Sequence, residues 1–256
     1  MPITEEIFAA FLKCETKAYL KYSSTLGAQS ELSQWRQHQQ KEYREACRKL
    51  LCSALHAPPF VGTPDLQTLK GQRFDLILDY IVAHGDIHAC LDALALSRGK
   101  RAKLDCPYTP IRFVPSERLS TDDKLMLAFD AVALSKVYGR TPRAGRIIHG
   151  RNQTVATVAL FPLLGRIQRV LRAVNDQQTK AVQPTLVLNK HCAECEFQSR
   201  CRQVAMQKDD LSLLTSLSPR SGKGRTKKEF SQCSNSPTRS GLRDVRHLRP
   251  QSITPH

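Results

Sequence analysis

Three cysteines stand close together near the end of this chain, and a fourth stands near its beginning. Cys192, Cys195 and Cys201 follow a C-x2-C-x5-C spacing, which is short enough for three thiolates to reach one centre. A four-coordinate metal site needs one more ligand, and Cys14 can supply it. Such a site would join the two ends of one domain, and no other feature of the sequence restricts the fold as strongly.

The spacing leaves the bound metal open. Four thiolates suit a [4Fe–4S] cluster, which tolerates irregular spacing with one remote ligand. The alternative is a Zn²⁺ ion held by the three late cysteines and His191, with Cys14 serving as a core residue of an amphipathic helix. Zinc accepts three thiolates and an imidazole, although the adjacent positions of His191 and Cys192 are awkward for chelation of one ion.

The bulk composition predicts a cytoplasmic protein with an ordinary core. The 256 residues are 41% hydrophobic, enough for one large domain or two small ones. An apolar run of membrane-spanning length and a signal peptide are both missing from the sequence. In a reducing compartment nine cysteines are expected to be thiols or metal ligands rather than disulfides. Cys47, Cys52, Cys90 and Cys106 lack ligand spacing and are interpreted as small core residues, and Cys233 also lacks such spacing.

The formal net charge of +16 favours a polyanionic partner, most often nucleic acid. Residues 218–256 hold nine Lys or Arg and two acidic residues, so this segment carries +7 and residues 1–217 carry +9. The segment is rich in Ser, Arg, Lys, Pro and Gly without periodicity, so we expect a disordered basic tail. The predicted organisation is a domain over residues 1–215 followed by a tail over 216–256.

Hydrophobic periodicity predicts an α/β domain with a small mixed sheet flanked by helices. Thr4 and Thr121 are the expected N-caps of the first and third helices. Pro107 and Pro110 predict that the third strand lies at an edge or is bulged. The expected helices cover 4–22, 30–55, 121–138, 163–176 and 199–209, and the expected strands cover 74–82, 86–96, 106–114, 146–149 and 155–160.

Several segments resemble the RecB-like nucleases that carry an iron–sulfur staple, including the CRISPR-associated RecB-type exonuclease. The resemblance covers about residues 3–215. It rests on the cysteine spacing and on Phe11-Leu-Lys-Cys14, Lys17-Ala-Tyr19, Lys124-Leu-Met-Leu-Ala-Phe-Asp130, Tyr138-Gly-Arg-Thr-Pro142 and Gly145-Arg-Ile-Ile-His-Gly150. It implies a PD-(D/E)xK nuclease-like core, with a [4Fe–4S] cluster on the four cysteines joining its two ends.

The resemblance also implies a catalytic centre, which this sequence matches only in part. Asp92 corresponds to the first aspartate of the family and would bind Mg²⁺ or Mn²⁺; the alternative is a carboxylate hydrogen-bonded to the backbone. Where the family has Glu-x-Lys, this chain has Pro110-Ile-Arg112, and arginine is not a proton acceptor near neutral pH. Glu117 and Lys124 are the candidate replacements for the missing pair; the alternative is that each is a solvated surface residue. The family's Gln-x-x-x-Tyr element is also replaced, by Met126 and Asp130.

Three functions are compatible with this pattern. The first is a metal-dependent nuclease of DNA repair acting on single-stranded or end-containing DNA, with Arg112, Arg166, Arg169 and Arg172 as phosphate contacts. The second is a catalytically degenerate DNA-binding or scaffold protein of the same fold, and the third is a zinc-stabilised interaction module. The resemblance further implies an RNase H-like or helicase partner. In relatives the chain continues past Asp209-Asp-Leu-Ser-Leu-Leu214 as a helical segment, so we interpret the residues after about 217 as truncated or frame-shifted.

Overall fold

The computed structural model describes residues 2–28, 30–65, 68, 72–97, 106–180 and 182–214. These residues form an α/β fold around one mixed sheet of seven strands, ordered β2-β3-β4-β5-β6-β7, with β1 pairing to β4. The pairs β3–β4, β4–β5 and β6–β7 are antiparallel, whereas β1–β4, β2–β3 and β5–β6 are parallel. The strands are β1 (Ile3–Thr4), β2 (Phe60–Val61), β3 (Leu76–His84), β4 (Ile87–Leu96), β5 (Tyr108–Val114), β6 (Ala144–His149) and β7 (Thr154–Ala159).

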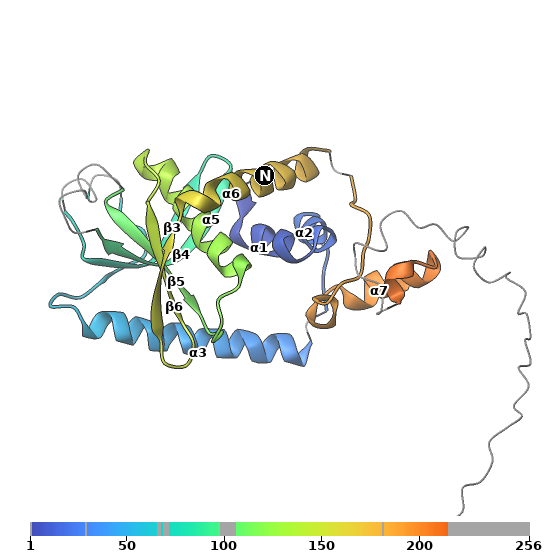
Figure 1. Cartoon of the computed structure of the whole chain (residues 1–256), viewed down its shortest axis with the longest axis horizontal. Coiled ribbons are helices and arrows are strands. Elements are labelled where there is room, and N and C mark those ends of the chain that lie inside the picture. The colour runs from blue at the N-terminus through green and yellow to red at the C-terminus, as the bar shows by residue number, and fades with distance from the viewer. Residues whose placement is uncertain are drawn as a thin grey trace, which may run out of the picture.

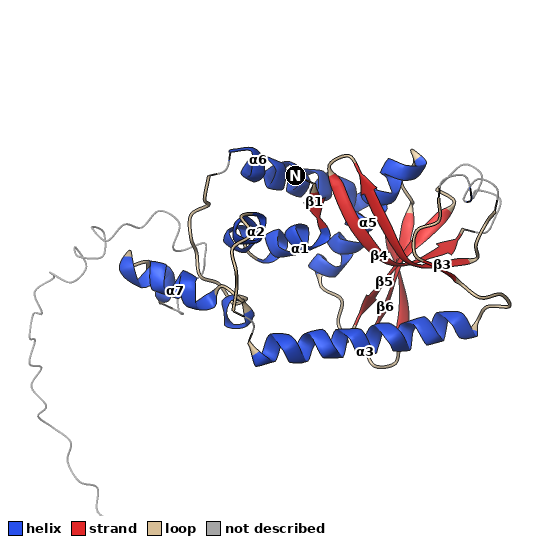
Figure 2. Ribbon diagram, turned by 180° about the vertical axis from the view of Figure 1, so that it is seen from behind, coloured by secondary structure: helices blue, strands red, loops and turns tan. Residues whose placement is uncertain are grey.

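Helices cover both faces of the sheet, and one helix stands apart from it. The long helix α3 runs along one face, α1, α5 and α6 lie on the other, and α7 lies beyond α2 (Figures 1 and 2). The helices in the described part are α1 (Glu5–Lys13), α2 (Glu15–Tyr22), α3 (Glu31–Ser53), α5 (Thr121–Tyr138), α6 (Phe161–Lys180) and α7 (Gln198–Gln207), with 3₁₀ turns η1 (Cys192–Glu194) and η2 (Leu211–Leu213). No helix of this part is both long and apolar enough to cross a lipid bilayer.

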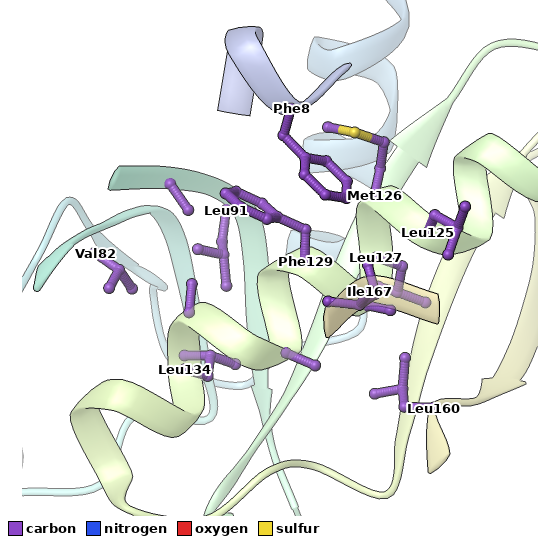
Figure 3. Packing of buried hydrophobic residues seen from close by; sticks show 14 of the residues in the cluster. Phe8, Val82, Leu91, Leu125, Met126, Leu127, Phe129, Leu134, Leu160 and Ile167 are labelled. Atoms are coloured by element: carbon purple, nitrogen blue, oxygen red, sulfur yellow. The ribbon is translucent and has the colours of Figure 1, made fainter. Parts of the chain in front are cut away.

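The larger core lies between the sheet and α5. Nine of the ten residues from Leu125 to Leu134 of α5 are buried, because this helix is enclosed by the sheet, α1 and α6. Phe8 of α1 stacks on Phe129 of α5 with ring centroids 4.6 Å apart, and Ile167 of α6 closes the same cluster (Figure 3). This packing fixes the N-terminal helix against the centre of the domain.

A smaller core lies under α3, and strand β3 changes face as it passes between the two cores. Leu76 and Leu78 pack in the cluster with Tyr43 of α3, whereas Tyr80 and Val82 pack in the cluster with α5. Asp79, between them, has the left-handed backbone angle φ 55°, a conformation that few residues other than glycine adopt and that Asp adopts more readily than most. The switch therefore turns the Asp79 carboxylate towards α3.

The predicted elements occur in the expected order, the short strands β1 and β2 were not predicted, and two corrections concern the helices. Thr4 caps α1 as expected, its hydroxyl accepting from the Ile7 amide at 3.2 Å. The segment 4–22 is nevertheless two helices, because Cys14 is extended (φ −165°, ψ 120°) between α1 and α2. The cap of α5 is Ser120 rather than Thr121, since Ser120 and Asp123 bond reciprocally in a capping box.

Of the two predictions for the third strand, an edge position or a bulge, the edge position is wrong, because β5 lies inside the sheet. Its first half, Tyr108 to Ile111, pairs with β4, and its second half, Ile111 to Val114, pairs with β6. Pro110 stands opposite Leu94, in the half without a β6 partner. A proline inside the sheet is tolerated here because only one neighbouring strand accompanies that half.

The remaining expectations concern the other cysteines and the tail. Cys47 and Cys106 are buried, while Cys52 and Cys90 are half-buried, so these four contribute to the interior as small side chains. Cys233 and the tail over 216–256 lie outside the described residues.

Candidate functional site

All four cysteines of the predicted metal site line one pocket. Cys14 comes from the junction of α1 and α2, Cys192 from η1, Cys195 from the residue that follows it, and Cys201 from α7. Each is a half-buried free thiol. Two segments that are almost 180 residues apart in the sequence therefore meet at this pocket, which His191 also lines.

An ionic contact holds the cysteine segment against α2. The Glu196 carboxylate lies 2.7 Å from Lys17 Nζ and 3.2 Å from Lys21 Nζ, and its backbone carbonyl accepts from the Ala28 amide at 2.9 Å. Burial opposes ionisation of Glu196, but the two lysines outweigh it and lower the pKa to about 2. A Cβ on Gly27 would stand 2.5 Å from Glu196 Cγ, so glycine permits this close approach.

Two further contacts tie the same segment to the rest of the chain. Glu194 pairs with Arg36 in the second turn of α3, and the Asn189 side-chain amide donates to the Lys13 carbonyl at 3.2 Å. The first contact joins the segment to the end of α3 that extends past the sheet (Figure 1). The pocket is thus assembled by ordinary polar contacts as well as by the cysteines themselves.

The thiols lie in an environment that changes their acidity. Burial and, after it, the neighbouring thiols of Cys195, Cys14 and Cys192 raise the pKa of Cys201 to about 11. The Asn189 amide donates to Cys192 Sγ at 3.2 Å. Burial raises the pKa of Cys195, and a hydrogen bond from the Phe197 amide acts against that rise. A bound cation would remove the mutual repulsion of the thiolates, and the two N–H groups suit thiolate ligands.

The donor chemistry of the pocket fits a soft metal or a cluster. Its lining contains four thiols and one imidazole and no carboxylate, a set suited to zinc or iron–sulfur rather than Mg²⁺. Burial, followed by Lys13 and Lys190, lowers the pKa of His191, which keeps its imidazole neutral. As the side chains stand, no group of three or more His, Cys, Asp and Glu residues in the described part is arranged to hold a metal ion, so loading requires the thiols to draw together.

A second polar centre surrounds Asp92, the predicted ligand for a divalent ion. Asp92 lies on β4 with 8% of its surface exposed. Its Oδ1 atom lies 2.8 Å from the Arg44 guanidinium of α3, and its Oδ2 atom accepts from the Phe113 amide at 2.9 Å. Burial raises the pKa of Asp92, while Arg112, Arg44 and the Phe113 amide act against that rise. Both carboxylate oxygens are therefore engaged by the protein itself.

Arg44 links Asp92 to a second carboxylate on the neighbouring strand. Its guanidinium also lies 2.7 Å from Asp79 Oδ1, and Arg48 lies 2.6 Å from Asp79 Oδ2. The change of face at Asp79 is what brings this carboxylate under α3. The Arg44 guanidinium thus lies between the Asp79 and Asp92 carboxylates, and both carboxylates attract a cation to this position.

Arg112, which the sequence resemblance aligns with a lysine, is bound on two sides. It forms a bidentate pair with Asp130 of α5, both distances being 2.9 Å, and lies 2.8 Å from Glu5 Oε1 of α1. Burial tends to lower the pKa of Arg112, but Asp130 and Glu5 hold it well above its usual value. The guanidinium is therefore a fixed charge at neutral pH and is not presented to solvent.

Glu117 and Lys124, the other two predicted catalytic residues, do not join Asp92. Within the described part, the hydrogen bonds and ion pairs of Asp92 are those with Arg44 and Phe113. Glu117 is exposed beyond β5 and accepts from the Arg151 amide at 3.0 Å, which supports the turn between β6 and β7. Lys124 is half-buried in the first turn of α5.

The three regularly spaced arginines of α6 are exposed. Arg166, Arg169 and Arg172 face away from the side of the helix on which Ile167 and Val174 are buried. They form one basic stripe that is accessible to a polyanion.

The residues that the sequence did not single out are Glu5, Arg44, Arg48 and Asp79. Arg44 and Arg48 stand four residues apart on α3, which places both on one helix face, but this signal does not say which carboxylates they meet. No known protein-family model matches this chain, and no curated protein matches its sequence.

Proposed function

We propose that this chain is a DNA-binding protein with the PD-(D/E)xK fold of the RecB-like nucleases and without their cleavage reaction. In this proposal a [4Fe–4S] cluster on Cys14, Cys192, Cys195 and Cys201 joins the two ends of the domain. The observation that carries the proposal is that Asp92 is ion-paired with Arg44 and Arg112 with Asp130, because Asp92 and Arg112 are the residues that the resemblance aligns with catalytic positions.

The ion pairs occupy the groups that would have to bind a metal ion or accept a proton in catalysis at this centre. A divalent ion needs free carboxylate oxygens, whereas Asp92 already binds Arg44 and the Phe113 amide. Arg112 cannot replace a lysine that accepts a proton, because guanidinium stays protonated, and it is held by Asp130 and Glu5. The centre is thus suited to holding α1, α3 and α5 to the sheet.

The cysteine pocket supports the structural cofactor. Four sulfur donors from both ends of the domain line it, and two backbone N–H groups point at sulfur. A cluster there supplies a covalent-strength crosslink between these ends. Glu196, Asn189 and Gly27 position the segment that carries three of the ligands.

The charge supports DNA as the partner. Residues 1–217 carry +9, and the exposed stripe of Arg166, Arg169 and Arg172 offers three cations at one helix face. Contacts of this kind bind phosphates without reading the sequence.

A second candidate is a Mg²⁺- or Mn²⁺-dependent nuclease, and one observation favours it. Asp79 and Asp92 lie on adjacent strands and share the Arg44 guanidinium, so a metal ion that displaced Arg44 would find two carboxylates. This candidate requires α3 to shift, because Arg44 belongs to that helix.

The test combines metal analysis with two DNA assays on protein purified without oxygen. We expect iron and sulfide in near-equal amounts close to four per chain, lost in Cys14→Ser. We expect DNA binding that weakens at least tenfold when Arg166, Arg169 and Arg172 become Gln, and no cleavage with Mg²⁺ or Mn²⁺.

Each contrary result points to one of the other functions. Cleavage that disappears in Asp92→Asn would establish the nuclease. One zinc ion per chain without DNA binding would establish the zinc-stabilised interaction module, in which His191→Ala should release the metal and Cys14→Ser should not.

A further inference from the structure

Strand β7 (Thr154–Ala159) forms one edge of the sheet, and its outer side has no partner strand in the described part. Its sequence is Thr-Val-Ala-Thr-Val-Ala, and Val158 is its one buried residue. The pairing with β6 runs unbroken from Ala144 opposite Ala159 to His149 opposite Thr154. Along β7 the outer row of backbone N–H and C=O groups is therefore not interrupted by a bulge.

An edge of this kind is unusual because natural sheets protect their edges. Common devices are charged residues, proline, a bulge or a very short strand. The opposite edge uses the last device, since β2 is only Phe60–Val61. In contrast β7 is six residues long, lacks charge and proline, and consists of Thr, Val and Ala with Val155 53% exposed.

We propose that β7 binds an extended acidic segment of a partner protein, which adds to the sheet as a further strand. This interaction surface is separate from the proposed cysteine and DNA sites. Main-chain hydrogen bonds along the edge supply affinity, as in other cases of strand addition, and the surrounding charge selects an acidic segment.

The part of the chain that contains the edge is basic. Residues 131–160 contain five Lys or Arg and no Asp or Glu. Arg146 is exposed on β6 directly opposite Thr157, and Arg151 is exposed in the turn that leads into β7. Glu117 is the acidic group at this turn, and its Oε1 atom is engaged by the Arg151 amide.

Arg146 is long enough to act on an added strand. Neighbouring strands lie about 4.8 Å apart, so the new strand would lie about 10 Å from β6, within reach of an extended arginine that crosses over Thr157. Val155 lies two residues along β7 from Thr157 and so shares its face of the sheet. The segment that fits best thus places acidic residues near Arg146 and Arg151 and an apolar residue beside Val155.

The charge also argues against a second copy of this chain as the occupant. Each copy carries a formal +16, and pairing two β7 edges would bring Arg146 and Arg151 of both copies together. Like charges placed in this way are unfavourable.

The test uses a blocked peptide of about eight residues, which spans β7 at about 3.3 Å per residue, composed of Val, Thr and Glu. Amide hydrogen exchange of the full chain is measured with and without this peptide, and affinity is measured by fluorescence anisotropy. The control peptide has Lys in place of Glu. The test variants are Arg146→Gln and Arg151→Gln, and Arg202→Gln on exposed α7 is the matched control.

We expect the acidic peptide to slow exchange of the amides over 154–159 and nowhere else in the sheet. Affinity should fall at least tenfold for the lysine peptide and for the double variant of Arg146 and Arg151, and remain unchanged in Arg202→Gln. Three results would overturn the proposal: no protection over 154–159, equal protection by the lysine peptide, or protection of these residues by single-stranded DNA alone. Protection that rises with protein concentration without peptide would instead assign the edge to a second copy.

Discussion

Replacing Arg44 with methionine tests whether this arginine is the cation that the two buried carboxylates require. The change keeps an unbranched side chain on α3 and removes the guanidinium that lies 2.8 Å from Asp92 and 2.7 Å from Asp79. Asp79 keeps Arg48 as a partner. The effect should therefore come mainly from Asp92, which is left with one fewer counter-charge in a buried position.

The expected loss in the free energy of unfolding is about 2–3 kcal/mol. Removal of one partner from a fully buried ion pair costs about 3–5 kcal/mol, and two features reduce this value here. Asp92 retains the Phe113 amide and the nearby Arg112, and the Arg44 side chain is 29% exposed. Arg48→Met is the matched control, since Arg48 pairs with the more exposed Asp79 and Glu45, and it should cost about 0.5–1 kcal/mol.

The loss should depend on pH with a defined sign. Burial already raises the pKa of Asp92, and Arg44 is one of the groups that act against the rise, so Arg44→Met raises it further. Above the unfolded value of about 4, the folded variant then holds a proton that the unfolded chain has released. The deficit relative to wild type should therefore grow as pH rises above the folded pKa of wild-type Asp92, which burial has already raised, and should shrink below it.

The assay is urea unfolding followed by far-ultraviolet circular dichroism, repeated between acidic and neutral pH. The double variant Arg44→Met with Asp92→Asn should lose about 1–2 kcal/mol less free energy of unfolding than the sum of the single losses. In the double variant neither Arg44 nor Asp92 remains as an unpaired charge. The reasoning is refuted if Arg44→Met and Arg48→Met cost the same, or if the deficit does not change with pH.

Three further changes give distinct outcomes. Phe129→Ala should lower the free energy of unfolding by about 3–5 kcal/mol, because the ring is fully buried on Phe8; the same urea assay measures it. Gly27→Val places a branched side chain where Glu196 Cγ would lie 2.5 Å from Cβ. Metal bound at the cysteine site should then be released to a chelator at least several-fold faster. Gly165→Val, where a Cβ meets open space, is the control: its release rate is measured in the same way and compared with its own loss of helix stability. Manganese should raise the melting temperature of Arg44→Met and leave that of wild type unchanged, and an equal rise in both would mean that Arg44 does not occupy the cation position.

The sequence predicted the parts of the fold that are governed by local patterns. The hairpin of β3 and β4 follows from two apolar runs separated by a short turn, and the N-cap Thr4 follows from the acidic first turn of α1. The interior position of β5 was missed because Pro110 argues for an edge, whereas the edge-like environment extends over only half of the strand. Strand order depends on tertiary pairing, which local periodicity does not contain.

The cysteine pocket could be predicted from the sequence, whereas the polar network around Asp92 could not. Spacing alone brought together the four cysteines that line one pocket. The network around Asp92 was not predictable, because Arg44 and Asp79 are distant in sequence and the left-handed residue at Asp79 leaves no mark on the alternation of β3. The break at Cys14 was missed for a similar reason, since one extended residue does not disturb a helical pattern of apolar residues.

The cysteine pocket sets an order of events during synthesis of the chain. Cys14 is made 187 residues before Cys201, an interval of about 9–37 s at about 5–20 residues per second. Once β4 and α5 have been made, β1 can pair with β4 and α1 can dock on α5, while the pocket wall that contains η1 and α7 does not yet exist. Until then the Cys14 thiol is protected only by α1 and α2. A chain that stalls before residue 192 retains a nearly complete sheet but lacks the three cysteines that complete the pocket around Cys14.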